Sequence, residues 1–246
     1  MRMVGVVLAG GSGQRFGAGV PKQLLELDGR TLLEHCVAAF DAAPGVDEVL
    51  VVMPPGRTAD AKELLDGRGP HGRGYGKLTG IIEGGSTRPG STRAAIAAVH
   101  AGREAHADRD PDQWAVLLHD AARPLVGQRI IADCVAALQR VDAVGVAMPT
   151  ADTIVVVESG VMRQIPRRDT LLRCQTPQGF RLPVITRAHE LALADPDYEP
   201  TDDCGVVLRY LPGVPVHVVE GSEQNLKITY PRDLAIARVL AGEDQP

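Results

Sequence analysis

The sequence predicts an α/β protein with a mostly parallel, twisted sheet that helices cover on both faces. Short, continuous apolar runs alternate with amphipathic segments of helical length along most of the chain. Continuous apolar runs are typical of parallel strands buried on both faces, and their alternation with helices indicates right-handed crossovers. The chain of 246 residues contains no linker-like segment and no internal repeat, so we expect a single domain over residues 1–246.

The first half of the chain predicts strands and helices in strict alternation. Residues 4–8 form an apolar run that is bounded by glycines, which indicates a buried first strand. Thr31 and Glu34 have the spacing of a helix capping box, and Pro44 and Gly45 end the helix that follows. The expected elements are strands at 4–8, 49–53, 78–82 and 115–118, and helices at 31–42, 58–65 and 91–106.

The second half departs from this alternation at Pro149. Two apolar stretches at 153–157 and 161–165 flank Glu158-Ser159-Gly160, a pattern that predicts a projecting two-stranded β-arm at about residues 150–170. The remaining expected elements are helices at 128–139, 183–194, 202–210 and 231–240, and strands at 144–148 and 216–219.

Composition and charge exclude several classes of protein. Aromatic residues make up only 3% of the chain and the formal net charge is −5, so we expect no nucleic-acid partner. Gly10 and Gly11 end the first apolar run before a signal peptide or membrane span could form. The four cysteines contain no C-x-x-C pair, which argues against a zinc site or a disulfide framework. We therefore expect a cytoplasmic protein with reduced thiols and no membrane contact.

A glycine-rich segment follows the first predicted strand directly. It reads Leu8-Ala-Gly-Gly-Ser-Gly-Gln-Arg15, and Pro21-Lys22 comes soon after it. Successive backbone N–H groups in such a loop can bind phosphate oxygens, and the two cations can offset the charge of a triphosphate. A purely structural turn is the alternative. The P-loop pattern fails because Gly76-Lys77 is followed by Leu78 and His71 stands where the first glycine should be. The dinucleotide-binding fingerprint fails because Phe16 stands where it needs its third glycine.

A second polar segment, His119-Asp-Ala-Ala-Arg-Pro124, ends the buried strand at 115–118. The carboxyl ends of parallel strands are where α/β proteins bind their ligands. Asp120 could orient a substrate hydroxyl or assist a metal ion, and Arg123 could bind a phosphate or hold Asp120 in place. A structural ion pair between them is the alternative, and His119 alone is expected to be a packed histidine rather than a base.

Taken together, these motifs resemble those of the 2-C-methyl-D-erythritol 4-phosphate cytidylyltransferase family. The resemblance extends over nearly the whole chain, and the order and spacing of the motifs match the family. The motifs are Ala9-Gly-Gly-x-Gly-x-Arg15, Pro21-Lys22, Gly84-Gly-x-x-Arg88-x-x-Ser91, His119-Asp-Ala-Ala-Arg-Pro124, Asp152-Thr153, Gln175-Thr-Pro-Gln178, Thr201-Asp202 and Lys227.

The resemblance implies a Rossmann-like nucleotidyltransferase domain, a reaction and a set of site residues. A phosphate of the polyol substrate would attack the α-phosphorus of CTP, and pyrophosphate would leave with the help of Mg²⁺ or another divalent cation. The implied CTP-binding residues are Ala9, Gly10, Gly11, Gly13, Gly85, Ser86 and Ser91. Catalytic roles are implied for Arg15, Lys22, Arg167 and Lys227. The implied substrate residues are Asp120, Arg123, Thr153, Thr176 and Thr201, with Asp120 also a candidate metal ligand.

The resemblance also implies a homodimer in which the arm, with Thr153, Arg167 and Thr176, reaches the neighbouring subunit. The sequence departs from the usual family pattern at Leu8-Ala-Gly-Gly11 and at Cys204-Gly205. The sibling ribitol-5-phosphate cytidylyltransferases share this first pattern, so D-ribitol 5-phosphate stays open as the alternative acceptor. A nicotinamide-dependent oxidoreductase is disfavoured by the failed fingerprint, and a non-catalytic nucleotide sensor by the cations at both phosphate positions.

Overall fold

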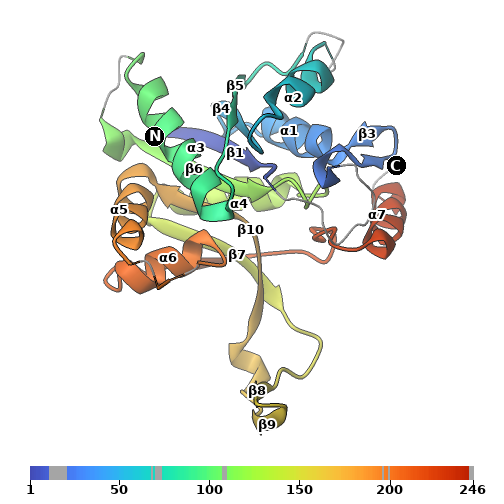
Figure 1. Ribbon diagram of the computed structural model, residues 1–246, viewed down its shortest axis with the longest axis vertical. Coiled ribbons are helices and arrows are strands. Elements are labelled where there is room, and N and C mark those ends of the chain that lie inside the picture. The colour runs from blue at the N-terminus through green and yellow to red at the C-terminus, as the bar shows by residue number, and fades with distance from the viewer. Residues whose placement is uncertain are drawn as a thin grey trace.

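The computed structural model describes residues 1–10, 21–67, 69, 74–106, 110–195, 197–198 and 200–243. Its centre is a sheet of seven strands in the order β11-β7-β10-β6-β1-β4-β5 (Figure 1). The strands are β1 (Arg2–Leu8), β4 (Glu48–Met53), β5 (Leu78–Glu83), β6 (Trp114–Asp120), β7 (Ala143–Pro149), β10 (Leu172–Arg181) and β11 (His217–Glu220). Only β10 runs antiparallel to its neighbours, β6 and β7. The predicted mostly parallel sheet is therefore confirmed.

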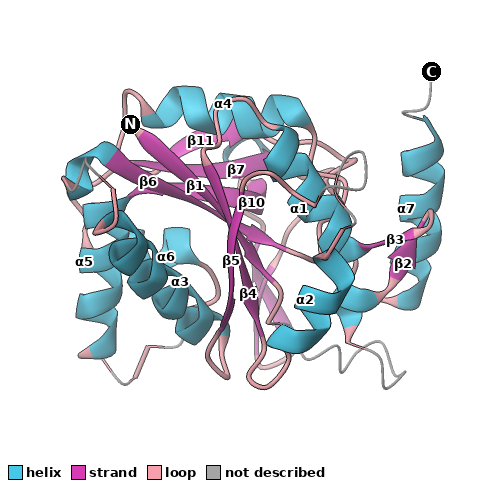
Figure 2. Ribbon diagram, turned by 90° about the horizontal axis from the view of Figure 1, so that it is seen from above, coloured by secondary structure: helices cyan, strands magenta, loops and turns pink. Residues whose placement is uncertain are grey.

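Helices pack on both faces of the sheet (Figure 2). One core cluster joins the sheet to α1 (Leu32–Ala42), α2 (Thr58–Leu65) and α4 (Gln128–Leu138). A second cluster joins the other face to α3 (Arg88–Arg103), α5 (Leu182–Leu193) and α6 (Asp203–Tyr210). None of the helices in the described part of the chain is long and apolar enough to cross a membrane.

Strand β1 shows how the apolar run supplies both cores. Met3 and Val7 belong to one cluster, whereas Val4 and Val6 belong to the other, because successive side chains of a strand point to opposite faces. Gly5 faces α1, where an added Cβ would lie 2.5 Å from the ring of Phe40. The α1 capping box predicted at Thr31 and Glu34 is present.

Two sheet elements were not predicted from the sequence. Strand β10 contains Pro177 and a register shift between Cys174 and Gln178, and both features are unusual for a central strand. The small hairpin of β2 (Glu26–Leu27) and β3 (Arg30–Thr31) turns at Asp28-Gly29, both with positive φ. An Asp-Gly pair is a strong hairpin signal, so this element could have been found. The hairpin packs with α7 (Pro231–Glu243) in a third, small cluster.

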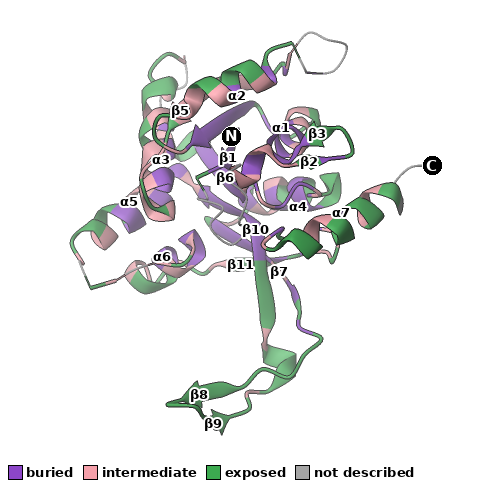
Figure 3. Cartoon of the chain, turned by 45° about the vertical axis from the view of Figure 1, so that its right-hand side comes forward, coloured by how far each residue is buried: buried purple, intermediate pink, exposed green. Residues whose placement is uncertain are grey.

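The predicted β-arm projects from the body between β7 and β10 (Figure 1). Its strands are β8 (Val156–Glu158) and β9 (Val161–Gln164), each shorter than expected. Figure 3 shows that the arm is exposed along its length. Many of its large apolar side chains are open to solvent: Ile154, Val155, Val156, Val157, Val161, Met162 and Ile165.

Candidate active site

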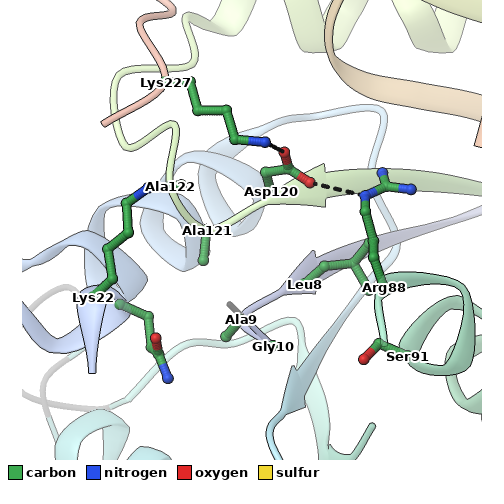
Figure 4. A pocket seen from close by; sticks show the side chains of 11 residues that line it. Leu8, Ala9, Gly10, Lys22, Arg88, Ser91, Asp120, Ala121, Ala122 and Lys227 are labelled. Carbon is green, nitrogen blue, oxygen red and sulfur yellow. Dashed lines mark hydrogen bonds and ion pairs between the residues drawn. The ribbon is translucent and has the colours of Figure 1, made fainter. Parts of the chain in front are cut away.

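A pocket opens at the carboxyl ends of β1 and β6 (Figure 4). Strand β1 is followed by α1 on one face of the sheet, whereas β5 returns to β6 through α3 on the other face. The crossovers thus diverge between β1 and β6, which is where open α/β sheets bind ligands. The lining residues are Leu8, Ala9, Gly10, Lys22, Gln23, Arg88, Ser91, Asp120, Ala121, Ala122 and Lys227.

Three cations from separate segments converge on this pocket. Lys22 lies on the 3₁₀ turn η2 (Lys22–Leu24), Arg88 begins α3, and Lys227 precedes α7. Asp120 ends β6 between two of them (Figure 4). Its Oδ2 accepts a hydrogen bond from Lys227 Nζ at 2.7 Å, and its Oδ1 lies 3.4 Å from Arg88 Nε. The pocket therefore concentrates positive charge around one carboxylate.

The carboxyl group of Asp120 is ionised. Burial alone would raise its pKa, but the neighbouring charges of Arg88 and Lys227 outweigh burial and hold that pKa well below its usual range. Both carboxylate oxygens face a cation, so Asp120 acts here as the counter-ion that orients Lys227 and Arg88.

A buried hydrogen-bond relay fixes the backbone of Asp120. The Asp120 amide donates to Thr176 Oγ1 at 3.1 Å, and Thr176 Oγ1 lies 3.0 Å from His119 Nδ1. His119 Nε2 lies 3.0 Å from the carbonyl oxygen of Arg123. A carbonyl can only accept, so Nε2 carries the proton and Nδ1 accepts from the threonine.

Burial lowers the pKa of His119 to about 4, so its imidazole is neutral at pH 7. The prediction that His119 is a packed histidine agrees with this arrangement. The motif resemblance implies that Thr176 belongs to the arm side of the substrate site. In the structure Thr176 is buried and takes part in this relay.

Arg123 does not line the pocket. Its Nη1 donates to the carbonyl oxygen of Asn225 at 2.7 Å and its Nη2 to that of Cys174 at 3.3 Å. It thereby ties the segment after β6 to β10 and to the segment that carries Lys227. The partners of Arg123 are backbone carbonyls rather than Asp120, so these contacts do not match the expected hold on Asp120. The substrate role implied for Arg123 stays a prediction.

The glycine-rich segments pack tightly against the start of α3. An added Cβ on Gly84 would lie 2.5 Å from Ser91 Oγ, and one on Gly85 would lie 2.7 Å from Gly90 Cα. Ser91 donates to the carbonyl oxygen of Thr87 at 3.1 Å. Gly10 and Ser91 both line the pocket, where an added Cβ on Gly10 would lie 3.1 Å from Ser91 Oγ, and Ser86 is exposed.

The other predicted site residues lie elsewhere or outside the described residues. Gly11, Gly13 and Arg15 belong to residues 11–20, which the structure does not describe. Thr153 and Arg167 are exposed on the arm, where Arg167 pairs with Asp169. Thr201 is exposed just before α6. These three residues do not line the pocket of their own chain.

Two polar residues that line the pocket, Gln23 and Arg88, were given no role from the sequence, although Arg88 belongs to the quoted motif Gly84-Gly-x-x-Arg88-x-x-Ser91. Arg88 stands three residues before Ser91, so both occupy the same face of a helix whose first turn follows the Gly84-Gly85 segment. Gln23, next to Lys22, is buried and lines the pocket, with no distinctive sequence signal.

The described residues do not fit a metal ion held by the protein alone. Among them, no three His, Cys, Asp or Glu side chains are grouped in a way that could hold a metal. In this pocket Asp120 is the carboxylate among the lining residues, and both of its oxygens already face cations. Mg²⁺ commonly binds through one or two carboxylates together with substrate phosphates. The site therefore fits a cation that arrives on a polyphosphate better than one resident in the protein.

Comparison with known proteins agrees with this geometry. The family model for 2-C-methyl-D-erythritol 4-phosphate cytidylyltransferase (IspD) matches residues 3–243. A protein of that name from Thermobifida fusca is 51% identical over 245 residues, covering 97% of this chain and 93% of the relative. The bifunctional ribulose 5-phosphate reductase/CDP-ribitol pyrophosphorylase Bcs1 of Haemophilus influenzae is 38% identical, covering 96% of this chain and 48% of that protein.

Solved structures point the same way. The 2-C-methyl-D-erythritol 4-phosphate cytidylyltransferase of Thermus thermophilus is 33% identical, with a TM-score of 0.70 and coverage of 96% of this chain and 98% of that one. The 4-diphosphocytidyl-2C-methyl-D-erythritol synthase of Anaerococcus prevotii has a TM-score of 0.78 at 24% identity, which shows the shared fold. Because the family model and a relative 51% identical both span almost the whole chain, this chain belongs to the 2-C-methyl-D-erythritol 4-phosphate cytidylyltransferase family.

Proposed function

We propose that the chain transfers the cytidylyl group of CTP to 2-C-methyl-D-erythritol 4-phosphate. The observation that carries this proposal is the convergence of Lys22, Arg88 and Lys227 on one pocket at the carboxyl ends of β1 and β6. A phosphate oxygen of the acceptor attacks the α-phosphorus of CTP, the bond between the α- and β-phosphates breaks, and pyrophosphate leaves. The relatives that cover this chain most fully carry the name of this activity.

The charges of the pocket suit a reaction between two anions. A triphosphate and a phosphate monoester repel each other, so catalysis of phosphoryl transfer depends on positioning and on electrostatic stabilisation. Lys22 lies on the side of the glycine segment after β1, where the triphosphate would bind, and Lys227 lies across Asp120 from Arg88. We assign Lys22 to the nucleotide phosphates and Lys227 to the acceptor phosphate. Arg15, Gly11 and Gly13 are proposed on the family motif alone.

No strong base is required in this mechanism. The second pKa of a phosphate monoester is about 6, so the attacking oxygen is already ionised at pH 7. His119 has a lowered pKa and both of its ring nitrogens are engaged, which agrees with a structural role. Asp120 keeps Lys227 in place and can accept a hydrogen bond from an acceptor hydroxyl.

We propose that the divalent cation enters bound to the triphosphate. Asp120 is its candidate protein ligand. The carboxylate oxygen that binds the cation would then also face Lys227 or Arg88. Omission of Mg²⁺ should abolish pyrophosphate release, whereas the ligand-free protein should bind Mg²⁺ only weakly in calorimetry. Tight binding of Mg²⁺ without nucleotide would contradict this.

We further propose a homodimer in which the arm completes the partner's site, and a cytoplasmic location that fits the free thiols. The arm exposes several large apolar side chains, and apolar side chains that gather on a surface mark protein–protein contacts. Arg167 and Thr153 lie on this arm, away from the pocket of their own chain. Gly85, Ser86 and Thr201 remain proposed ligand contacts.

Mixing inactive variants tests the shared site. Lys22→Ala and Arg167→Ala are each expected to be nearly inactive. After subunit exchange about half of the dimers are mixed and each has one intact site, so about one quarter of wild-type activity should return. Activity that stays at the level of the separate variants would place Arg167 in its own subunit's site.

D-Ribitol 5-phosphate is the second candidate acceptor. One observation favours it: Bcs1, named as a CDP-ribitol pyrophosphorylase, is 38% identical over 242 residues. The relative from Thermobifida fusca, at 51% identity, favours the methylerythritol phosphate. The direct test is mass spectrometry of the products formed from CTP, Mg²⁺ and each acceptor. A CDP-linked polyol with equimolar pyrophosphate supports the reaction class, and no product with either acceptor would refute it.

A further inference from the structure

A buried acidic residue lies directly behind the pocket. Asp203 is the first residue of α6 and is 1% exposed, and its Oδ1 lies 3.1 Å from Nε2 of the equally buried His189 on α5. Its Oδ2 accepts a hydrogen bond from Arg88 Nη1 at 2.7 Å. The Asp203 amide donates to Gln178 Oε1 at 3.0 Å, which fixes the start of α6 to β10. Arg88, which lines the pocket, thus links Asp203 to it.

The guanidinium of Arg88 is shared unequally between two carboxylates. Its contact with Asp203 is short, whereas Nε lies 3.4 Å from Asp120 Oδ1, at the long limit of a hydrogen bond. Among the residues that the structure describes, its Nη2 is buried and has no hydrogen-bond partner. A guanidinium has five donors and pairs best with a carboxylate through two parallel hydrogen bonds. Arg88 therefore has unused donors and a second carboxylate within reach, and the contact with Asp203 opposes its movement.

Lys227 and Arg88 each approach a different oxygen of the Asp120 carboxylate. Lys227 Nζ is 2.7 Å from Asp120 Oδ2, and the lysine side chain is 47% exposed. If Arg88 paired with both oxygens of Asp120, it would compete directly with Lys227 for Oδ2.

We propose that Asp203 is a positioning residue for the acceptor side of the pocket, an inference that rests on the proposed function. By anchoring Arg88 from behind, it prevents Arg88 from closing on Asp120 and so keeps Lys227 directed at the acceptor phosphate. The burial that raises the pKa of Asp203 is outweighed by Arg88 and His189, which lower it, so Asp203 carries the negative charge that this role requires.

Kinetics of Asp203→Asn test the proposal. The substitution keeps the volume and removes the charge. We expect the KM for 2-C-methyl-D-erythritol 4-phosphate to rise about tenfold, equivalent to about 1.4 kcal/mol, with the KM for CTP within about twofold. Asp195→Asn is the matched control, because Asp195 pairs with Arg209 and Tyr210 in the same α5–α6 layer without contact with the pocket. Unchanged KM values, or equal increases for both substrates, would overturn the proposal.

A double-mutant cycle covers the case in which Asp203→Asn fails to fold. The double variant Arg88→Met/Asp203→Asn removes both partners of the ion pair, so it leaves neither partner as an unpaired buried charge. If Asp203 acts only through Arg88, adding Asp203→Asn to Arg88→Met should leave the acceptor KM unchanged within about twofold. A further rise of about tenfold in that background would overturn the proposal.

Crystal structures separate this inference from the proposed function. In ligand-free Asp203→Asn, Arg88 should move to within hydrogen-bond distance of both Asp120 oxygens, whatever the acceptor is. If the wild type turns over neither polyol phosphate but Arg88 moves as expected, the function fails and the positioning stands. An unmoved Arg88 in Asp203→Asn would refute the positioning while leaving the function intact.

Discussion

Thr176→Val should destabilise the protein by breaking the relay behind Asp120. Valine has the shape of threonine but lacks the hydroxyl, which accepts from the Asp120 amide at 3.1 Å and pairs with His119 Nδ1 at 3.0 Å. Each buried polar group left without a partner costs about 1–3 kcal/mol, which gives about 2–6 kcal/mol for the two groups. The hydrogen bond from the Asp120 amide is only partly buried, so we expect the lower half, about 2–4 kcal/mol.

The assay is thermal unfolding followed by calorimetry. For a chain of this size each kcal/mol lowers Tm by about 2–4 °C, so the expected decrease is about 4–16 °C. Thr176→Ser retains the hydroxyl and should lose only about 0.8 kcal/mol for the missing methyl group. Thr79→Val is the surface control, because Thr79 is exposed on β5, and it should change stability by less than about 0.5 kcal/mol. If Thr176→Val unfolds within about 2 °C of the wild type, the relay does not stabilise this site in the way described.

Three further predictions concern charge, pH and thiol reactivity. Lys22→Ala should lower kcat by about 100-fold or more with little change in Tm, since it removes a cation from the pocket wall rather than from a core; near-normal turnover would exclude Lys22 from the mechanism. The pKa of His119 is about 4 when folded and about 6.5 when unfolded, so the unfolded chain binds the extra proton between these values. The stability from this group is complete above pH 6.5 and falls by up to about 3 kcal/mol as pH decreases toward 4. Urea unfolding from pH 7 to 4.5 should show a smaller loss for His119→Gln, and equal slopes would contradict the buried neutral imidazole. Finally, a thiol reagent should modify exposed Cys174 in the native protein, more slowly than a free cysteine because partial burial raises the pKa of its thiol. The buried Cys36, Cys134 and Cys204 should react only after unfolding, as counted by mass spectrometry.

The sequence alone predicted those parts of the fold that depend on local pattern. The apolar run predicts β1, and the capping box at Thr31 predicts α1, each within a few residues of its observed bounds. Periodicity and cap chemistry are therefore sufficient to place these two elements. Strand β10 was not predicted because its buried side chains Gln175, Thr176 and Gln178 are polar. Each of them is hydrogen-bonded to a segment distant in the sequence. No local pattern can reveal such pairing.

The position of the site was predictable, but its internal connections were not. Asp120 and the glycine segment both follow apolar runs, and the rule that ligands bind at the carboxyl ends of parallel strands brings them together. The pairs that set the charges join residues more than 100 positions apart: Lys227 with Asp120, and Arg88 with Asp203. For Arg123 the sequence allowed a phosphate ligand or a hold on Asp120, and it does not reveal the hydrogen bonds of the guanidinium to the carbonyl oxygens of Asn225 and Cys174.

A competition between the two acceptors tests the central claim most directly. Equal concentrations of 2-C-methyl-D-erythritol 4-phosphate and D-ribitol 5-phosphate would be supplied with CTP and Mg²⁺, and the initial ratio of the two CDP-linked products equals the ratio of kcat/KM. We predict that the methylerythritol product exceeds the ribitol product by at least about tenfold, the discrimination that a pocket contact with one methyl group can supply. A ratio below one would contradict the assigned acceptor and make this chain a ribitol-phosphate cytidylyltransferase.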